Sequence, residues 1–393
     1  MAPFLESARI KNFKSLGDIS LSFKRLTIIV GANSSGKSCC LESLNLLKSL
    51  IRSGKIVPSL IRENDVRRGY STGGITLQVF IKEKRKKIDY SINLTIDNPE
   101  SNFMVTSEHL KIAKVPVIAI NKGEGNLQDE STSNTSKQPY HATSKEVALS
   151  SVGNIGDKPI TKSLANFIKK WEFYDLDPRS IRLNDFLQSK IESFLESPTI
   201  LDFAGMKLQS LLQHWASDNI QIFTEVSREV RRYLNIELFT EDCKGKLIVK
   251  AKESNGLEIP FGNLSDGSLR IIGYCSLLYS PDIPTLIAIE EPESNLHPGI
   301  LQDVASILKR LSQKTQVVIT THSSQLLDCF SMEDITSNDV SVILFKKNPH
   351  IGTEAIGLET LIDNNAGLQD WMQDFGIGSA IYHSNLIQEV LEN

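Results

Sequence analysis

Apolar residues form three short continuous runs along the chain, and each has the length of a strand rather than a helix. The runs are rich in β-branched residues and span residues 26–30, 285–289 and 317–320. Runs of this kind predict strands buried on both faces, as in the sheet of an α/β protein. Small, acidic or hydroxyl-bearing residues follow each run at once, so polar groups are expected at the strand ends.

Alternation of apolar and polar residues predicts antiparallel strands in two further regions. Residues 75–81 and 88–96 alternate and are joined by the basic segment 82–87, which predicts a hairpin with a charged tip. Residues 246–250 and 257–261 form a second predicted hairpin, in which an Asn-Gly pair supplies the turn. A basic tip can contact a phosphate backbone, but such a charged run is more often a solvated turn.

Helical spacing of apolar residues returns in the middle third of the chain. The predicted helices span residues 163–170, 185–196 and 204–234. Before them, residues 121–158 are polar and rich in Ser, Asn, Gly and Thr, which predicts a mobile segment with little packed structure. We therefore expect an N-terminal lobe at residues 1–115, a polar excursion with a helical insertion at 116–240, and a C-terminal lobe at 241–393.

The composition indicates a globular protein without a strong charge signal. Of 393 residues, 40% are hydrophobic and 23% charged; the net charge is -4 and the mean hydropathy -0.15. The chain contains neither an apolar run of roughly eighteen residues nor an N-terminal signal segment, so we expect a cytoplasmic protein without a membrane partner. Nucleic-acid contacts would need local basic patches. The five cysteines form no C-x-x-C pair and are expected to be reduced and mostly in the core.

A phosphate-binding loop follows the first apolar run. Residues 31–38 read Gly-Ala-Asn-Ser-Ser-Gly-Lys-Ser, the complete pattern G-x-x-x-x-G-K-S. The glycines allow a tight turn whose N–H groups face inward, and the start of the next helix adds its positive dipole end. We expect Lys37 to contact the outer phosphates of ATP and Ser38 to bind Mg²⁺. The residues predicted to contact the nucleotide are Asn33, Ser34, Ser35, Gly36, Lys37, Ser38 and Cys39.

Two adjacent carboxylates follow the second apolar run. Glu290 and Glu291 at the tip of a buried strand are unfavourable for folding unless a cation is bound there. Because side chains on a strand alternate between faces, the two glutamates cannot share one role. We expect Glu290 to bind Mg²⁺ and Glu291 to act as the general base that activates water. The alternative is an acidic turn after a core strand.

A second anion-binding helix start lies between these two segments. Ser265 and the backbone of Gly267 precede an apolar helix and can donate hydrogen bonds to a γ-phosphate. The chain's own nucleotide is expected at Lys37. The target of Ser265 and Gly267 is therefore expected to be the nucleotide of a second copy, which predicts a homodimer with ATP sandwiched between subunits.

Residues 264–267, Leu-Ser-Asp-Gly, resemble the ABC signature as spelled in the SMC, RecF and OLD families. In the same order as in these families, residues 294–298 are similar to the D-loop, and the strand at 317–320 with residues 321–324 after it is similar to the switch-histidine loop. Residues 8–16 are similar to the first strand and turn. The resemblance implies an ABC-type P-loop ATPase head with an antiparallel β lobe, a mainly parallel core sheet and an inserted helical lid.

The resemblance also implies roles for single residues. His322 matches the histidine that contacts the γ-phosphate, and Lys14, with Asn12, matches the turn beside the nucleotide. The chain departs from the pattern at His297, where transporters of this superfamily carry an aspartate. Gln78 is the candidate for the Q-loop, although it falls in a predicted strand.

Residues 323–393 contain no D-x-D, so the TOPRIM nuclease of the OLD family is not expected, nor do heptads predict long SMC arms. By analogy with such families, we expect an ATPase that regulates a separately encoded effector. This effector would be a nuclease or toxin of anti-phage defence. One alternative is a RecF-like repair or recombination clamp that binds DNA, with Lys84, Arg85 and Lys87 as candidate contacts. Another is a scaffold that ATP locks with negligible turnover.

Overall fold

The computed structural model describes residues 2–67, 74–97, 102–130, 137–188, 199–243, 245–337, 339–348, 350–364 and 366–383. The chain divides into two compact units, and both are discontinuous in sequence. Unit 1 contains Met1–Trp171 and Ile335–Gln369, and unit 2 contains Glu172–Asp334 and Asp370–Ser384. The predicted domain boundaries at residues 115 and 240 stay a prediction.

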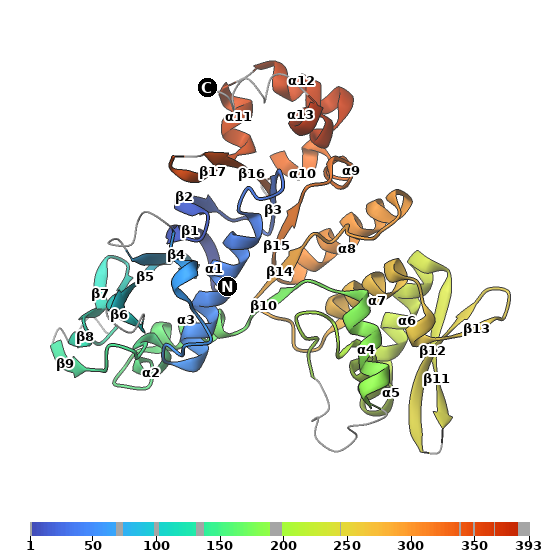
Figure 1. The fold of residues 1–393 in the computed structure, drawn as a ribbon, viewed down its shortest axis with the longest axis horizontal. Helices are drawn as coiled ribbons and strands as arrows, with labels where there is room; N and C mark the ends of the chain where they lie inside the picture. The colour runs from blue at the N-terminus through green and yellow to red at the C-terminus, as the bar shows by residue number, and fades with distance from the viewer. Residues whose placement is uncertain are drawn as a thin grey trace. The chain divides into compact units, whose positions relative to one another are not determined.

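A mixed group of strands forms the centre of unit 1 (Figure 1). β3 (Leu26–Gly31) is buried along its length up to Gly31, as its apolar run predicts, and pairs in parallel with β16 (Val340–Asn348). β17 (Gly352–Gly357) runs antiparallel to β16 and parallel to β2 (Leu16–Ser22). β1 (Phe4–Phe13) then pairs with β2 and leads into the antiparallel strands. Helix α1 (Lys37–Ser53) follows β3.

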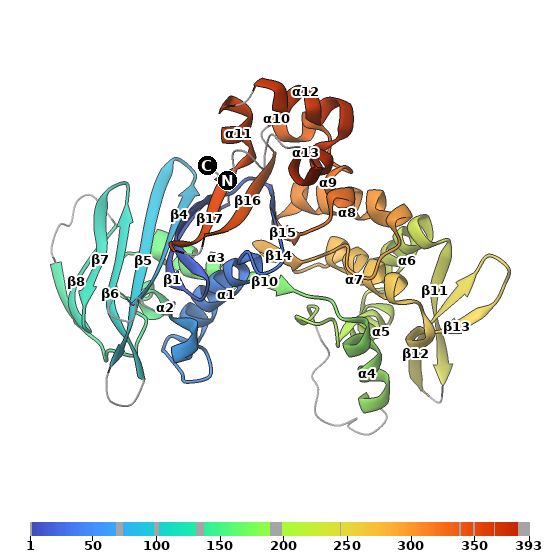
Figure 2. The same cartoon turned by 45° about the horizontal axis from the view of Figure 1, so that its top comes forward.

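Antiparallel strands continue this sheet, side by side in Figure 2. They are β4 (Ile75–Glu83), β5 (Lys86–Asp97), β6 (Asn102–Ile112), β7 (Val115–Asn121), β8 (Glu124–Gln128) and β9 (Lys137–His141). The first two form the hairpin that alternation predicted, and every second residue of β4 is buried from Ile75 to Ile81. The antiparallel β lobe is confirmed.

The prediction that residues 121–158 have little packed structure was wrong. This segment contains β8, β9 and helix α2 (Leu149–Val152), and both ends of α2 are fully buried. The buried carboxylate of Glu108 on β6 accepts hydrogen bonds from the N–H groups of Ala148 and Leu149, at 2.7 Å each. The polar composition gave a wrong prediction for two reasons. Short strands expose one face to solvent, and the carboxylate of Glu108 on β6 caps helix α2. Helices α3 (Pro159–Lys169) and α11 (Leu358–Asn364) complete unit 1.

Unit 2 contains the other two apolar runs as neighbouring strands. β14 (Leu286–Glu290) pairs in parallel with β15 (Gln316–Thr321), so Glu290 lies opposite Thr320. β10 (Trp171–Tyr174) lies on the other side of β14. The apolar helix α7 (Asp266–Tyr279) precedes β14 in the chain, and the amphipathic helix α8 (Leu301–Lys314) follows it.

The inserted helices are α4 (Pro178–Gln188), α5 (Leu208–Asp218) and α6 (Ile220–Leu234). The long helix predicted at 204–234 is two helices that break at Asn219, and the predicted helix at 185–196 overlaps α4 and then runs outside the described residues. The predicted hairpin is present as β12 (Lys246–Glu253) and β13 (Glu258–Pro260). A third strand, β11 (Ile236–Cys243), was not predicted and pairs with β12. The three strands are yellow in Figures 1 and 2.

Four further short helices are described: α9 (Ser324–Leu327) and α10 (Met332–Thr336) precede β16, and α12 (Ala366–Phe375) and α13 (Ile377–His383) follow α11. All five cysteines are free, but only Cys40 and Cys275 are buried, so the prediction that most lie in the core was wrong. Among the described residues, no helix combines the length and the apolar character needed to cross a bilayer.

Candidate functional site

The P-loop in unit 1 has the strand, turn and helix that its sequence predicts. β3 ends at Gly31 and α1 begins at Lys37, with left-handed backbone at Ser34 (φ 63°) and Gly36 (φ 103°). A Cβ atom on Gly36 would lie 2.5 Å from Thr353 Oγ1, so a side chain does not fit there. Gly36 is the N-cap of α1 and has no side chain that could cap the helix. A helix that starts in this way directs backbone N–H groups toward the loop, which suits phosphate binding.

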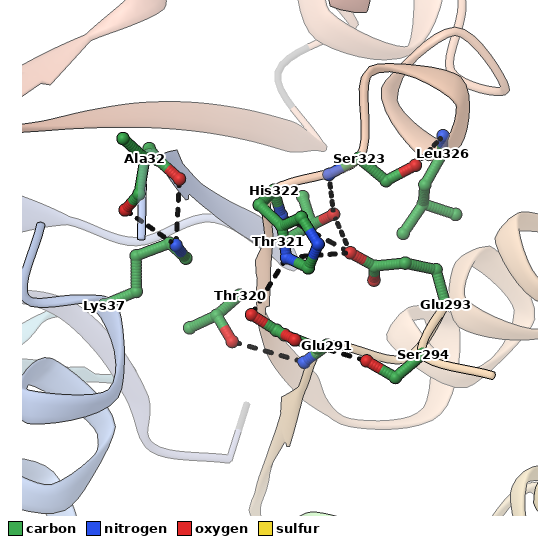
Figure 3. Close-up of polar contacts among 11 residues, drawn as sticks. Ala32, Lys37, Glu291, Glu293, Ser294, Thr320, Thr321, His322, Ser323 and Leu326 are labelled. Carbon is green, nitrogen blue, oxygen red and sulfur yellow. Dashed lines mark hydrogen bonds and ion pairs between the residues drawn. The ribbon is translucent and has the colours of Figure 1, made fainter. Parts of the chain in front are cut away.

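The Lys37 side chain donates hydrogen bonds to two carbonyl groups of its own loop. Its Nζ donates to the carbonyl oxygens of Gly31, at 2.8 Å, and Ala32, at 3.1 Å (Figure 3). Within the described part of the chain, the buried Ser35 Oγ has no hydrogen-bond partner. A buried hydroxyl in this position fits a loop that donates to phosphate oxygens. Asn33, Ser34 and Ser38 are exposed, and Cys39 is half-buried.

Other residues predicted near the nucleotide have partners inside unit 1. Lys14 has left-handed backbone and pairs with Glu42 of α1, at 2.5 Å, and with Asp65, at 3.5 Å. The Asn12 amide donates to Gly74 O at 3.0 Å. The Gln78 amide donates to Asp89 across β4 and β5, at 2.7 Å, so it stabilises the antiparallel sheet.

In unit 2, the chain turns sharply after β14. Glu290 is the last residue of the strand and is half-buried, whereas Glu291 has left-handed backbone with φ 37°. The Glu291 N–H donates to Thr320 O at 3.0 Å, which ties this turn to β15. A non-glycine residue in this region is strained and persists where its surroundings hold it. Strain of this kind is common at functional sites.

The Glu291 side chain meets the loop that follows β15. Its Oε1 lies 2.9 Å from His322 Nδ1, and its Oε2 accepts from Ser294 Oγ at 3.2 Å. Figure 3 shows both loops meeting at this carboxylate. Because an ionised carboxylate only accepts hydrogen bonds, the proton of this pair lies on Nδ1 of His322. The structure thus brings the predicted base and the predicted switch histidine together.

Glu293 is a member of this site that the sequence analysis missed. The residue is buried, and its Oε1 accepts from Thr321 Oγ1 at 2.5 Å and from the His322 N–H at 3.4 Å. Burial raises the pKa of Glu293 above its usual value. The sequence did contain a signal for Glu293, because it is the third carboxylate of the Glu-Glu-Pro-Glu run. A turn with so many acidic side chains needs hydrogen-bond partners within the protein.

The signature segment forms an exposed helix start in unit 2. Ser265 is the N-cap of α7, and its Oγ accepts from the Ser268 N–H at 3.1 Å. A Cβ atom on Gly267 would lie 3.3 Å from Leu296 Cδ2, so the D-loop packs directly against the signature. In that loop, His297 Nδ1 accepts from the Gly299 N–H at 3.1 Å and thereby caps a short 3-10 helix.

The described residues offer few side-chain ligands for magnesium, which suits an ion that takes further ligands from phosphate oxygens. Nowhere in the described residues do three or more His, Cys, Asp or Glu side chains gather as a metal site. Mg²⁺ commonly takes one or two protein oxygens together with substrate phosphates and water. The Ser38 hydroxyl at the start of α1 and the Glu290 carboxylate at the end of β14 are of the right chemical type, and their role stays a prediction.

Comparisons with known proteins agree with this architecture. A family model described as "AAA domain, putative AbiEii toxin, Type IV TA system" matches residues 26–328. The chain is 25% identical to the Old nuclease of Escherichia phage P2 over 82% of this chain and 57% of that protein's length. It is 23% identical to the "Retron Vc95 probable ATPase" of Vibrio cholerae serotype O1 biovar El Tor, over 83% and 71%.

A solved structure supports the fold. The Smc head domain of Pyrococcus furiosus, with an extended coiled coil and bound to the C-terminal domain of ScpA, aligns with a TM-score of 0.51 and 12% identity. The alignment covers 94% of this chain and 100% of that one. At this identity, the similarity concerns the fold alone.

Proposed function

Because the chain belongs to this AAA family and is an ABC-type ATPase of the RecF, SMC and OLD group, we propose that two copies close around ATP. In this proposal, the P-loop of one copy and the signature of the other grip the same triphosphate. ATP hydrolysis then requires both copies.

The second exposed helix start carries this proposal. α1 and α7 both follow polar loops that contain exposed residues and fit phosphate, yet a bound nucleotide needs only one P-loop. Ser265 is exposed at the start of α7, so its hydroxyl is accessible to a ligand outside the subunit. Gly267 keeps the backbone there free of a side chain, which lets a phosphate approach the N–H groups.

Each site residue has a chemical role in this arrangement. Lys37 supplies a positive charge to the outer phosphates, and Ser38 and Glu290 are the residues that would hold Mg²⁺. The bound ion supplies charge neutralisation at the phosphates. Glu291 accepts the proton of the attacking water, and His322 orients its carboxylate through the 2.9 Å hydrogen bond. Ser265 and Gly267 of the second copy donate to the γ-phosphate.

We extend the proposal to a role in anti-phage defence through a separately encoded effector. The family description contains the words toxin and type IV TA system, and one relative is the retron protein described above. These names support an ATPase that controls a nuclease or toxin. Co-purification of the chain with the product of a neighbouring gene, dependent on ATP, is the measurement that tests this part.

Mixing two inactive variants tests the shared site. Ser265→Arg blocks the signature, and Lys37→Ala removes the P-loop charge, so each variant alone should have little turnover. A mixed dimer contains one site with both elements intact, and about half of the molecules in an equal mixture are mixed dimers if pairing is random. We expect turnover to reappear on mixing. A mixture as inactive as its components would contradict sharing between subunits.

A DNA clamp is the second candidate function, and a cluster of cations in unit 1 favours it. The Ala113 N–H donates to Lys87 O at 2.8 Å, so the β4–β5 and β6–β7 turns lie side by side. The exposed cations of residues 84–87 and 111–114 are Lys84, Arg85, Lys86, Lys87, Lys111 and Lys114. Neutralising Lys84, Arg85 and Lys87 should abolish salt-sensitive DNA binding. Neutralising three exposed arginines of α6, Arg228, Arg231 and Arg232, is the matched control and should leave binding unchanged.

A further inference from the structure

Arg182 on α4 contacts the signature loop with all three nitrogens of its guanidinium group. Nε donates to Gly262 O at 3.0 Å, and Nη2 donates to Leu264 O at 2.6 Å. Nη1 forms an ion pair with Asp266 Oδ1 at 2.7 Å. These contacts fall on both sides of Ser265, the residue that caps α7. A planar guanidinium that binds three acceptors fixes their relative positions, which a lysine cannot do.

Helix α4 is itself firmly held within unit 2. Asp177 caps its start by accepting hydrogen bonds from the N–H groups of Arg179, at 3.2 Å, and Ser180, at 3.1 Å. Ile181, next to Arg182, is buried. Leu176 packs on α7, because a Cβ atom on Gly273 would lie 2.6 Å from Leu176 Cδ1. Arg182 therefore connects an anchored helix to an exposed loop.

The ion pair also changes the charge beside the exposed helix start. Asp266 directly follows Ser265, and 50% of its side chain is exposed. An unbalanced carboxylate at this position repels an approaching triphosphate, because the two negative charges lie close together in a partly desolvated interface. Arg182 balances this carboxylate, so the charge of Asp266 no longer opposes an anion that approaches the start of α7.

We propose that Arg182 is a positioning residue of the signature half-site, and that through it α4 controls ATP hydrolysis by the other copy. This inference rests on the proposed ATP sandwich. Arg182 holds Ser265 in place through the carbonyls of Gly262 and Leu264 and neutralises Asp266. It does not touch the nucleotide of its own subunit in this scheme, so its loss affects turnover and not the binding of ATP by the P-loop.

Arg182→Ala and Arg182→Lys test the positioning role. We expect Arg182→Ala to lower kcat on the order of tenfold to hundredfold, the size of effect that follows when a reacting group is misplaced. The Kd for ATP, measured with Glu291→Gln present to prevent hydrolysis, should change less than about twofold, because each P-loop is intact. Arg182→Lys keeps the charge but not the three-way geometry and should fall between wild type and Arg182→Ala.

Arg179→Ala is the matched control, since Arg179 is an exposed arginine on the same helix. It should leave kcat and the melting temperature unchanged. Unchanged kcat in Arg182→Ala overturns the proposal. A large loss of ATP affinity, or of melting temperature, in parallel with kcat also overturns it, because the effect is then one of folding.

A double variant tests the electrostatic half of the proposal. If Arg182 neutralises Asp266, then Arg182→Ala combined with Asp266→Asn should recover several-fold of the turnover that Arg182→Ala loses. No recovery overturns the charge-balancing role. The recovery should be largest at low salt, because a partly exposed carboxylate is screened as ionic strength rises.

Mixing variants separates this inference from the sandwich itself. Arg182→Ala mixed with Lys37→Ala should restore one composite site, because the Lys37→Ala copy supplies an intact signature. A different outcome is that turnover returns when Ser265→Arg is mixed with Lys37→Ala but not when Arg182→Ala is mixed with Lys37→Ala. That result overturns the role of Arg182 and still supports the ATP sandwich. Failure of both mixtures overturns the sandwich, and the role of Arg182 with it.

Discussion

Nδ1 of His322 lies 2.9 Å from Oε1 of Glu291, although 31 positions separate the two residues in the chain. β14 and β15 are parallel neighbours, so the loops that follow them emerge at the same edge of the sheet. Thr320 fixes the backbone of Glu291, and Glu293 fixes the backbone of His322. The orientation of the predicted base is therefore a property of two loops together.

Glu291→Gln should retain ATP binding while turnover falls by on the order of 10² to 10⁴, the usual contribution of a general base. The amide keeps the shape of the side chain but cannot accept the proton of water. Single-turnover hydrolysis and equilibrium ATP binding, measured on the same preparation, check this expectation. A variant with the wild-type rate would assign the role of base to another residue.

Lys37→Ala should weaken ATP binding by about 1.5 to 3 kcal/mol, because one charge-assisted contact to phosphate is lost. This corresponds to a roughly ten- to hundredfold higher Kd, measured by titration with a fluorescent ATP analogue. Arg52→Ala, an exposed cation near the end of the same helix, is the control and should bind normally. Equal affinity in Lys37→Ala and wild type contradicts the P-loop assignment.

Glu293→Ala should destabilise the protein by about 1 to 3 kcal/mol, because the buried Thr321 hydroxyl and the His322 N–H lose their acceptor. It should also lower kcat, since the loop that carries His322 is no longer held. Glu293→Gln retains an acceptor oxygen and similar volume, so its effects on both quantities should be smaller. Urea unfolding and steady-state turnover of the two variants provide the comparison. Equal effects of Ala and Gln are incompatible with the hydrogen-bonding role.

Arg310→Ala should lower the free energy of unfolding by about 3 kcal/mol, because the buried Glu229 then keeps only the exposed Arg232, at 3.7 Å, as a nearby cation. In the native protein, Arg310 pairs with Glu229, and the Tyr279 hydroxyl donates to the same carboxylate at 2.7 Å. Urea unfolding at neutral pH measures the loss. Arg228→Ala removes an exposed ion pair with Glu225 from the same helix as Glu229, and should cost less than about 1 kcal/mol.

The same network predicts that the free energy of unfolding depends on pH in the acidic range. Burial raises the pKa of Glu229, but the hydrogen bonds from Arg310 and the tyrosines outweigh it and lower the pKa to about 2, from an ordinary 4.5. A carboxyl group whose pKa is depressed in the native state stabilises that state at pH values above its ordinary pKa of 4.5. This contribution is lost as the pH falls from 4.5 toward 2. Unfolding free energies measured from pH 6 to pH 3 should fall more steeply in wild type than in Arg310→Ala.

Local sequence determined the elements of the nucleotide site. β3 with the start of α1, the tip of β14 and the start of α7 lie where the apolar runs and glycine patterns predict them. Such elements depend on neighbouring residues: a buried strand needs a continuous apolar run, and a tight turn needs glycine. The hairpin at residues 75–96 was predictable for the same reason, since alternation over two adjacent segments is a short-range signal.

Contacts between distant segments decided the rest. The order in residues 121–158 depends on Glu108 of β6. The position of Glu293 depends on a partner 28 positions away, and that of Arg182 on partners at least 80 positions away. No local pattern specifies these pairs, because hydrogen bonds and burial depend on which segments the fold brings together. The sequence alone thus determined which groups we predict to bind phosphate and to accept a proton, and the tertiary structure decided which side chains hold these groups in position.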